Sequence, residues 1–192
     1  MKLLVFIIFF ISEVSFGDFV SSRDIYVTAN NTSIYAKCIP EGSGENREEG
    51  RTLVYRAKPN EDVLLYSFDW YASQTYITRL NTVRVGSAPT GHQASESDLG
   101  IAFYHETNMV ARYSMLDLAG SKDNVMVWAS HYSVIKNIGG FIRVQKKYES
   151  AAEYTDPIYC FELLLHDDRK LIFNIKTGKI IELSADMTIR KL

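Results

Sequence analysis

The sequence is short of the features that mark several large classes of protein. It has 2 cysteines and 4 prolines among 192 residues, and its 21 Lys and Arg residues are balanced by 23 Asp and Glu residues. Nucleic acids and anionic membrane surfaces attract a concentrated basic face, which this balance does not provide. Beyond residue 17 there is no run of the roughly 20 apolar residues that a membrane-spanning helix needs. We therefore expect no nucleic-acid partner and no integral membrane segment in the mature chain.

The longest unbroken apolar run lies at the N-terminus. A lysine precedes apolar residues 3–11, and the small residues Ser15 and Gly17 follow shortly afterwards. This arrangement is typical of a secretory signal peptide that is cleaved after a small residue. It predicts a secreted or periplasmic protein in which residues 1–17 are the signal peptide and residues 18–192 form a single exported domain.

Short apolar runs separated by turn residues dominate the rest of the sequence. Its 12 Tyr and 10 Phe residues suit the half-buried, pleated surface of a sheet, and no window shows a long apolar stripe at helical spacing. The pattern predicts an all-β, antiparallel meander that forms a sandwich or an open barrel-like domain. The expected strands are residues 25–28, 33–39, 52–57, 63–70, 82–85, 99–105, 109–113, 125–132, 141–147, 158–166, 170–175 and 179–183.

Turn chemistry predicts three hairpins and one short helical turn. Ser114 and Asp117 have the spacing of a capping box, and Gly120 follows as a stop signal. We expect a helix of little more than one turn there, which redirects the chain between strands. In the last hairpin, Gly178 can take the positive φ that a tight connection requires. The expected hairpin turns lie within residues 105–109, 167–169 and 176–179.

Cys38 and Cys160 form an isolated pair in a chain that we expect to reach an oxidising compartment. Such a pair predicts a disulfide bond between them. They are 160 − 38 = 122 positions apart, so the bond would close a loop worth roughly 4 to 5 kcal/mol in the chain-entropy model. The alternative is two buried free thiols, because both cysteines lie in apolar strand patterns.

Two polar segments suggest surface chemistry. Asn30 and Asn31 each begin an Asn-x-Ser/Thr triplet, which a eukaryotic secretory pathway could glycosylate and which otherwise forms a polar turn. We favour the turn. The long loop over residues 86–98 contains His92 and ends against an expected strand, so we consider His92 part of a candidate ligand loop.

Histidines at strand ends are the one pattern that suggests a reaction. His105 and Glu106 follow one expected strand, and His166 and Asp167 follow another. If the sheet joined these strand ends, the four side chains could assist hydrolysis with a metal ion or as general acid and base. The alternative is that they face water or satisfy the turn backbone. The histidines lack metal-ligand spacing, so we expect no metal and no cofactor.

The second half of the chain resembles a group of known proteins. The segments that match are Ala102-Phe103-Tyr104, Val110-x-x-Tyr113-Ser114-x-x-Asp117-Leu118, Leu171-Ile172-Phe173-Asn174 and Thr177-Gly178-Lys179-Ile180. They are similar to uncharacterised exported bacterial β-rich proteins with propeller-like strand repeats. The resemblance covers residues 99–183, and it implies no activity and no catalytic residue. The chain is too short for a complete propeller, which has at least about four four-stranded blades.

These observations predict an exported binding or interaction module without catalysis. Its partner would be an unknown protein or a small ligand. One alternative is a metal-assisted or general acid-base hydrolase built from the four strand-end side chains. Another is an inhibitor or immunity-type partner of a second exported protein, which would show one contiguous apolar patch of several hundred Å².

Overall fold

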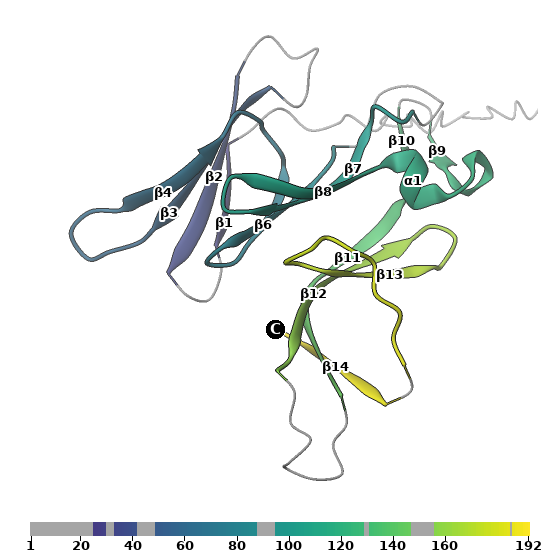
Figure 1. Ribbon diagram of the computed structural model, residues 1–192. Helices are drawn as coiled ribbons and strands as arrows, with labels where there is room; N and C mark the ends of the chain where they lie inside the picture. Colours follow the sequence, from purple (N-terminus) through teal and green to yellow (C-terminus); the bar gives the residue numbers. More distant parts are fainter. Residues whose placement is uncertain are drawn as a thin grey trace, which may run out of the picture.

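The computed structural model describes residues 25–29, 33–41, 49–87, 95–128, 131–146, 156–184 and 186–192 (Figure 1). The expected signal peptide, Asn30, Asn31 and His92 lie outside the described residues. The elements are, in chain order, β1 (Tyr26–Ala29), β2 (Ile34–Pro40), β3 (Gly50–Arg56), β4 (Val63–Phe68), β5 (Gln74–Ile77), β6 (Asn81–Val85), β7 (Leu99–His105), β8 (Asn108–Ser114), α1 (Met115–Ala119), the 3₁₀ turn η1 (Lys122–Asn124), β9 (Met126–Val127), β10 (Tyr132–Ser133), β11 (Ile135–Lys146), β12 (Ile158–Leu165), β13 (Lys170–Asn174) and β14 (Met187–Lys191).

Twelve of the strands form three antiparallel sheets of four strands each. The first sheet has the order β1-β2-β3-β4, the central sheet has the order β5-β6-β7-β8, and the third sheet has the order β13-β12-β11-β14. Strands β9 and β10 make a separate short ribbon. The prediction of an all-β antiparallel fold is confirmed, and no sheet in the described part of the chain closes into a barrel.

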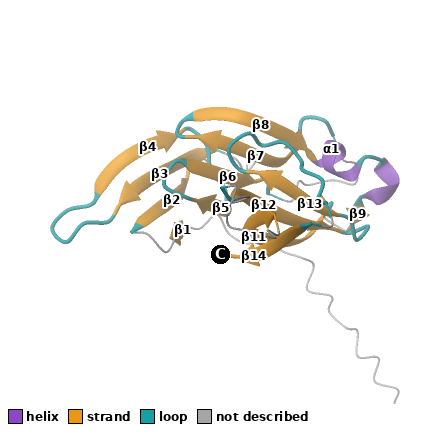
Figure 2. Cartoon of the chain, turned by 60° about the horizontal axis from the view of Figure 1, so that its bottom comes forward, coloured by secondary structure: helices purple, strands orange, loops and turns teal. Residues whose placement is uncertain are grey.

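Strands β6 and β7 of the central sheet are buried on both faces, because the first and third sheets both pack against them, whereas Met109 and Val110 of the edge strand β8 are exposed. In Figure 2 the central strands lie between those of the other two sheets. Ile101 and Phe103 of β7 belong to the cluster shared with the third sheet and α1. The residue that follows each of them, Ala102 and Tyr104, belongs to the cluster shared with the first sheet. Successive residues of a strand point to opposite faces, so one strand contributes to both cores.

Helix α1 begins and ends where the sequence predicts. The Ser114 side chain accepts a hydrogen bond from the backbone N–H of Asp117, and the Asp117 carboxylate accepts one from the backbone N–H of Ser114. Gly120 ends the helix with φ 68°, in the left-handed region. The helix packs Met115 and Leu118 against the core between the central and third sheets, so it closes one end of that core.

The turns of the three predicted hairpins also form, and each uses a residue with positive φ. Glu106 (φ 51°) joins β7 to β8, Asp168 (φ 64°) joins β12 to β13, and Gly178 (φ 66°) follows β13. After Gly178 the expected strand over residues 179–183 is reduced to a single bridge between Phe173 and Ile180. That strand prediction is wrong, because the segment crosses the outward face of the third sheet and packs Ile181 on it.

Other strand boundaries differ from the sequence-based expectation. The expected strand over residues 125–132 is replaced by two short strands, β9 and β10, which pair antiparallel with each other. Strand β11 starts six residues before the expected strand at residue 141 and contains two register shifts. Strands β5 and β14 were not expected, because both are short and are rich in polar or charged residues.

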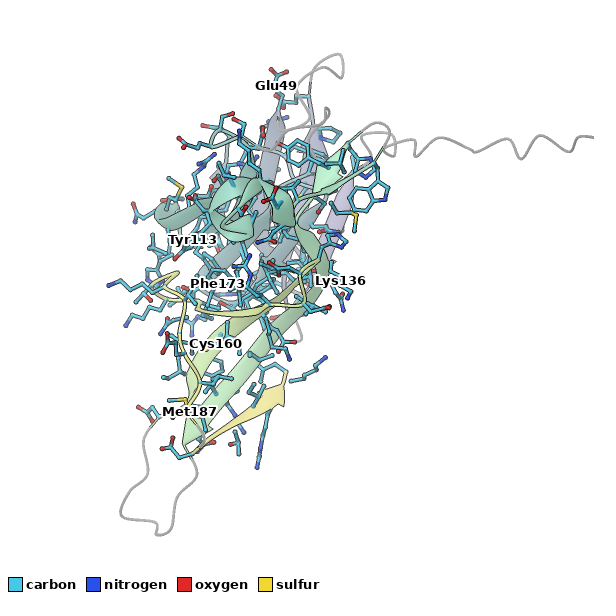
Figure 3. The ribbon with its side chains drawn as sticks, turned by 90° about the vertical axis from the view of Figure 1, so that its right-hand side faces the viewer. Glu49, Tyr113, Lys136, Cys160, Phe173 and Met187 are labelled. Carbon is cyan, nitrogen blue, oxygen red and sulfur yellow. The ribbon has the colours of Figure 1, made fainter. Side chains whose placement is uncertain are left out.

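The expected disulfide between Cys38 and Cys160 is wrong, and both residues are buried free thiols. Cys38 lies between the first and central sheets, where its Sγ donates to Thr75 Oγ1 at 3.4 Å. Cys160 packs with Ile142 and Ile172 on the outward face of the third sheet (Figure 3). Two sheet-to-sheet spacings of roughly 10 Å therefore separate the cysteines, whereas a disulfide needs Cα atoms within about 7 Å.

Candidate binding groove

The first pair of candidate catalytic residues lies at the end of the central sheet that is remote from α1. His105 ends β7, and its Nδ1 is 3.1 Å from Asn81 Oδ1 on the neighbouring strand. Glu106 follows in the turn, where its backbone N–H donates to the carbonyl oxygen of Leu80 at 2.7 Å. These contacts are those of a strand end and a turn.

The second pair lies in the β12–β13 hairpin. The backbone N–H of His166 donates to the carbonyl oxygen of Val134, and burial, with the nearby charge of Lys136, lowers the pKa of the His166 ring. Burial acts to raise the pKa of Asp167, but hydrogen bonds and the charge from Arg169 outweigh it and hold that pKa below its usual value. Arg169 Nε lies 2.6 Å from Asp167 Oδ2.

The structure does not bring these two pairs together. Arg169 joins the second hairpin to α1, because its Nη2 donates to the carbonyl oxygens of Leu118 and Ala119 at 2.9 and 2.6 Å. His105 lies at the opposite end of β7, six residues and roughly 20 Å of extended strand away. Among the described residues there is also no group of three or more His, Cys, Asp or Glu side chains that could hold a metal ion.

His166 instead belongs to an aromatic cluster that the sequence analysis did not predict. The rings of Trp128 and His131 stack with centroids 4.9 Å apart and an interplanar angle of 14°. The Trp128 ring meets His166 edge-on at 5.4 Å. Trp128 and His131 flank the β9–β10 turn and His166 follows β12, so the cluster attaches the ribbon to the third sheet.

A hollow with a largely apolar lining lies where all three sheets contribute residues. We call it the sheet-end groove, and its volume is about 630 Å³. Ala29 of the first sheet, Tyr76 and Leu80 of the central sheet region, and Phe141 and Tyr159 of the third sheet line it. Concave, mostly apolar surfaces of about 300 to 1,000 Å³ are the usual form of small-ligand sites.

A pair of glycines in β11 shapes the third-sheet side of the groove. A register shift between Ile138 and Gly140 makes a bulge in the pairing with β12. At Gly139 a Cβ atom would come within 2.4 Å of the Glu162 carboxylate, so only glycine fits there. At Gly140, which has φ 78°, a Cβ atom would meet nothing within 4 Å. The bulge thus leaves open space beside Phe141 in the groove wall.

A second, more polar hollow adjoins the groove. Its volume is about 460 Å³, and Arg56, Tyr66 and Glu106 line it. It shares Arg79 and Leu80 of the β5–β6 turn with the sheet-end groove. Glu106 therefore faces the polar hollow, and the apolar groove has no acidic side chain in its lining.

One feature of the sequence, a pair of glycines, indicates part of the groove wall. A Gly-Gly pair before an apolar strand indicates a bulge or a close approach of the backbone, and Gly139 and Gly140 make both. The other wall residues come from segments far apart in the chain, and no local pattern joins them.

Two further observations bear on the class of protein. Within the described residues, no helix combines the length and the apolar character needed to span a bilayer. Comparison with protein-family models, with curated proteins and with solved structures gave no match.

Proposed function

We propose that the protein is an exported binding module that holds a small, mostly apolar ligand in the sheet-end groove without catalysing a reaction. The observation that supports this proposal is the groove itself, a concavity of about 630 Å³ to which all three sheets contribute. A site built on sheet strands and tight turns is preformed, so binding costs little conformational entropy.

Leu80 gives the sharpest test of the proposal. It lines the groove and is 42% exposed, so a polar substitution there removes ligand contact without opening the core. Leu183 is the matched control, because it is 39% exposed and lies outside the groove lining. At either position a glutamine side chain would lie at the surface, in contact with water.

The experiment is a titration with the neutral apolar dye N-phenyl-1-naphthylamine, whose fluorescence rises in apolar surroundings. We expect saturable binding to the wild-type protein and about fivefold weaker binding to Leu80→Gln, since about 1 kcal/mol of apolar contact is lost. Leu183→Gln is expected to bind as the wild type does. No saturable binding, or equal loss in both variants, would contradict the proposal.

Export is a separate part of the proposal. It rests on the sequence of residues 1–17, which has the charge, apolar run and small residues of a signal peptide. N-terminal sequencing of the protein from the extracellular or periplasmic fraction is expected to start at Asp18. A product that keeps its leader and stays with the cytosol would refute it.

A further inference from the structure

We infer that the ligand of the sheet-end groove is a single-chain amphiphile with an anionic head, such as a fatty-acid carboxylate. This inference rests on the proposed binding function and specifies its ligand. The apolar chain would lie along the groove wall, and the anion would lie at the two basic residues of the lining, Arg79 and Lys191.

The charge of the groove points to an anion. Arg79 lies in the β5–β6 turn and Lys191 lies in β14; both are exposed, and neither forms an ion pair with another described residue. The lining contains no Asp or Glu side chain. The side chains that line the groove thus carry a net positive charge in a chain whose formal net charge is −2, and positive side chains complement a negatively charged ligand.

The polar side chains of the β5–β6 turn are already hydrogen-bonded to each other. Thr78 Oγ1 accepts from the backbone N–H of Asn81 at 3.1 Å and lies 3.4 Å from its side-chain amide nitrogen. The amide oxygen of Asn81 lies 3.1 Å from His105 Nδ1. A ligand rich in hydrogen-bonding groups, such as a peptide backbone or a sugar, would find these partners engaged.

The groove wall offers aromatic and aliphatic surface to an apolar chain. Tyr76 and Phe141 meet edge-to-face with centroids 6.3 Å apart, and Ile175 lies in the same lining. Burial raises the pKa of Tyr76, so its phenol stays neutral at physiological pH. Each methylene group that enters such surroundings contributes about 0.8 kcal/mol, so affinity should rise with chain length.

The test is a competition experiment in which ligands displace N-phenyl-1-naphthylamine from the full mature chain. Dodecanoate, dodecanol and dodecylamine have the same chain and differ in the charge of the head, and acetate supplies the anion without the chain. All are used as monomers below their micelle concentrations. We expect dodecanoate to bind about tenfold more tightly than dodecanol, dodecylamine to bind more weakly still, and acetate not to compete.

The double variant Arg79→Gln/Lys191→Gln isolates the role of charge. It is expected to bind dodecanoate and dodecanol equally and to keep the wild-type affinity for dodecanol. The matched control is Lys122→Gln/Lys176→Gln, which removes the same charge from exposed residues outside the groove. That control should keep the tenfold preference, and added salt should reduce the preference in the wild type.

The outcomes separate this inference from the proposed function. Equal binding of the three dodecyl compounds, or a preference that survives Arg79→Gln/Lys191→Gln, overturns the anionic amphiphile and leaves the binding function standing. Displacement by an apolar peptide with a free carboxyl terminus, but not by dodecanoate, also overturns it. Failure of the dye itself to bind refutes both proposals.

The Gly140→Asn variant gives an independent structural check. Asparagine tolerates the left-handed backbone better than other residues with a side chain, and nothing lies within 4 Å of the new Cβ. Its polar side chain would occupy the space beside the groove wall and should weaken dodecanoate and dodecanol binding about equally, by roughly tenfold. Unchanged binding with unchanged thermal stability would overturn the assignment of the ligand to this groove.

Discussion

The first and third sheets are built alike, yet they are buried differently. Strand β2 alternates between buried and partly buried residues, whereas residues 160–163 of β12 are buried in succession. The outward face of the third sheet is covered by a later part of the chain, which packs Ile181 and Met187 on it. Within the described residues, no apolar cluster covers the outward face of the first sheet, where Leu64 is 51% exposed.

This difference in burial shows how a sheet with one covered face differs from a sheet with two covered faces. Strict alternation of apolar and polar residues indicates one covered face, and a continuous apolar run indicates two. In this protein the burial alternates over residues 34–38 and is continuous over residues 160–163, although neither segment has the corresponding sequence pattern in full. The comparison predicts that equivalent substitutions will cost more stability in the third sheet.

The largest effect is expected at Phe161, at the centre of the core between the central and third sheets. Its side chain is fully buried, and its ring lies 4.9 Å from that of Tyr76 and 5.5 Å from that of Phe141. Phe161→Ala should lower the free energy of unfolding by about 4 kcal/mol. Phe68→Ala, in the core on the first-sheet side, should cost about 3 kcal/mol, because Phe68 is 6% exposed.

Urea denaturation at equal protein concentrations measures both values, provided that the slope with denaturant is unchanged. A larger loss for Phe68→Ala than for Phe161→Ala would reverse the comparison. The sequence alone does not predict this ranking, because Phe68 and Phe161 both stand in apolar strands. The two residues differ in the core that they occupy: Phe161 lies between the central and third sheets, and Phe68 lies between the first and central sheets.

The next effect compares the two outward faces directly. Ile142 is fully buried under the crossing segment, so Ile142→Ala should cost about 3 kcal/mol. Leu53 lies on the outward face of the first sheet, opposite Lys37 and Ser67, and Leu53→Ala should cost about 1 kcal/mol or less. Similar losses for the two variants in urea denaturation would contradict the comparison between the two outward faces.

A smaller effect is expected at Arg169, which joins the third sheet to α1. Arg169→Gln removes the charge-assisted hydrogen bonds to the carbonyl oxygens of Leu118 and Ala119. The loss should be about 1 to 2 kcal/mol, since the side chain is partly exposed. Arg190→Gln, on the exposed edge strand β14, is the control and should change stability by less than about 0.5 kcal/mol. Thermal denaturation followed by circular dichroism tests both.

The smallest effect concerns pH and the thiol of Cys160. Burial raises the pKa of this thiol to about 11 from an ordinary value of 9.0. The folded protein therefore holds the proton more tightly than the unfolded chain does, and the resulting stability is lost as pH rises from about 9 to 11. We expect the wild type to lose about 1 kcal/mol more than Cys160→Ala between neutral pH and about pH 10. If the free energies of unfolding of the two proteins fall in parallel as pH rises, the raised pKa of the Cys160 thiol is refuted.

Much of the fold could be predicted from the sequence because its signals are local. The capping box from Ser114 to Asp117, the stop at Gly120 and the turns of the hairpins each depend on a few neighbouring residues. Strand β5 was missed because four residues that include Gln74 and Thr75 make no apolar run, and pairing with β6 supplies its stability.

The site was harder to predict because its parts depend on how the sheets stack. Spacing along the chain could not show that the central sheet lies between Cys38 and Cys160, nor that His105 and His166 stand at opposite ends of the fold. The groove wall joins residues from Ala29 to Lys191, and only the packed structure brings them together.

Strands β6 and β7 of the central sheet are covered on both faces, and this has a consequence for how the molecule comes apart. If either flanking sheet were released, Phe103 or Tyr104 and their neighbours would be left against water, at a cost comparable with the whole stability of an ordinary domain. The three sheets should therefore melt as one cooperative unit, and cutting the chain between them should yield aggregating fragments rather than independent modules.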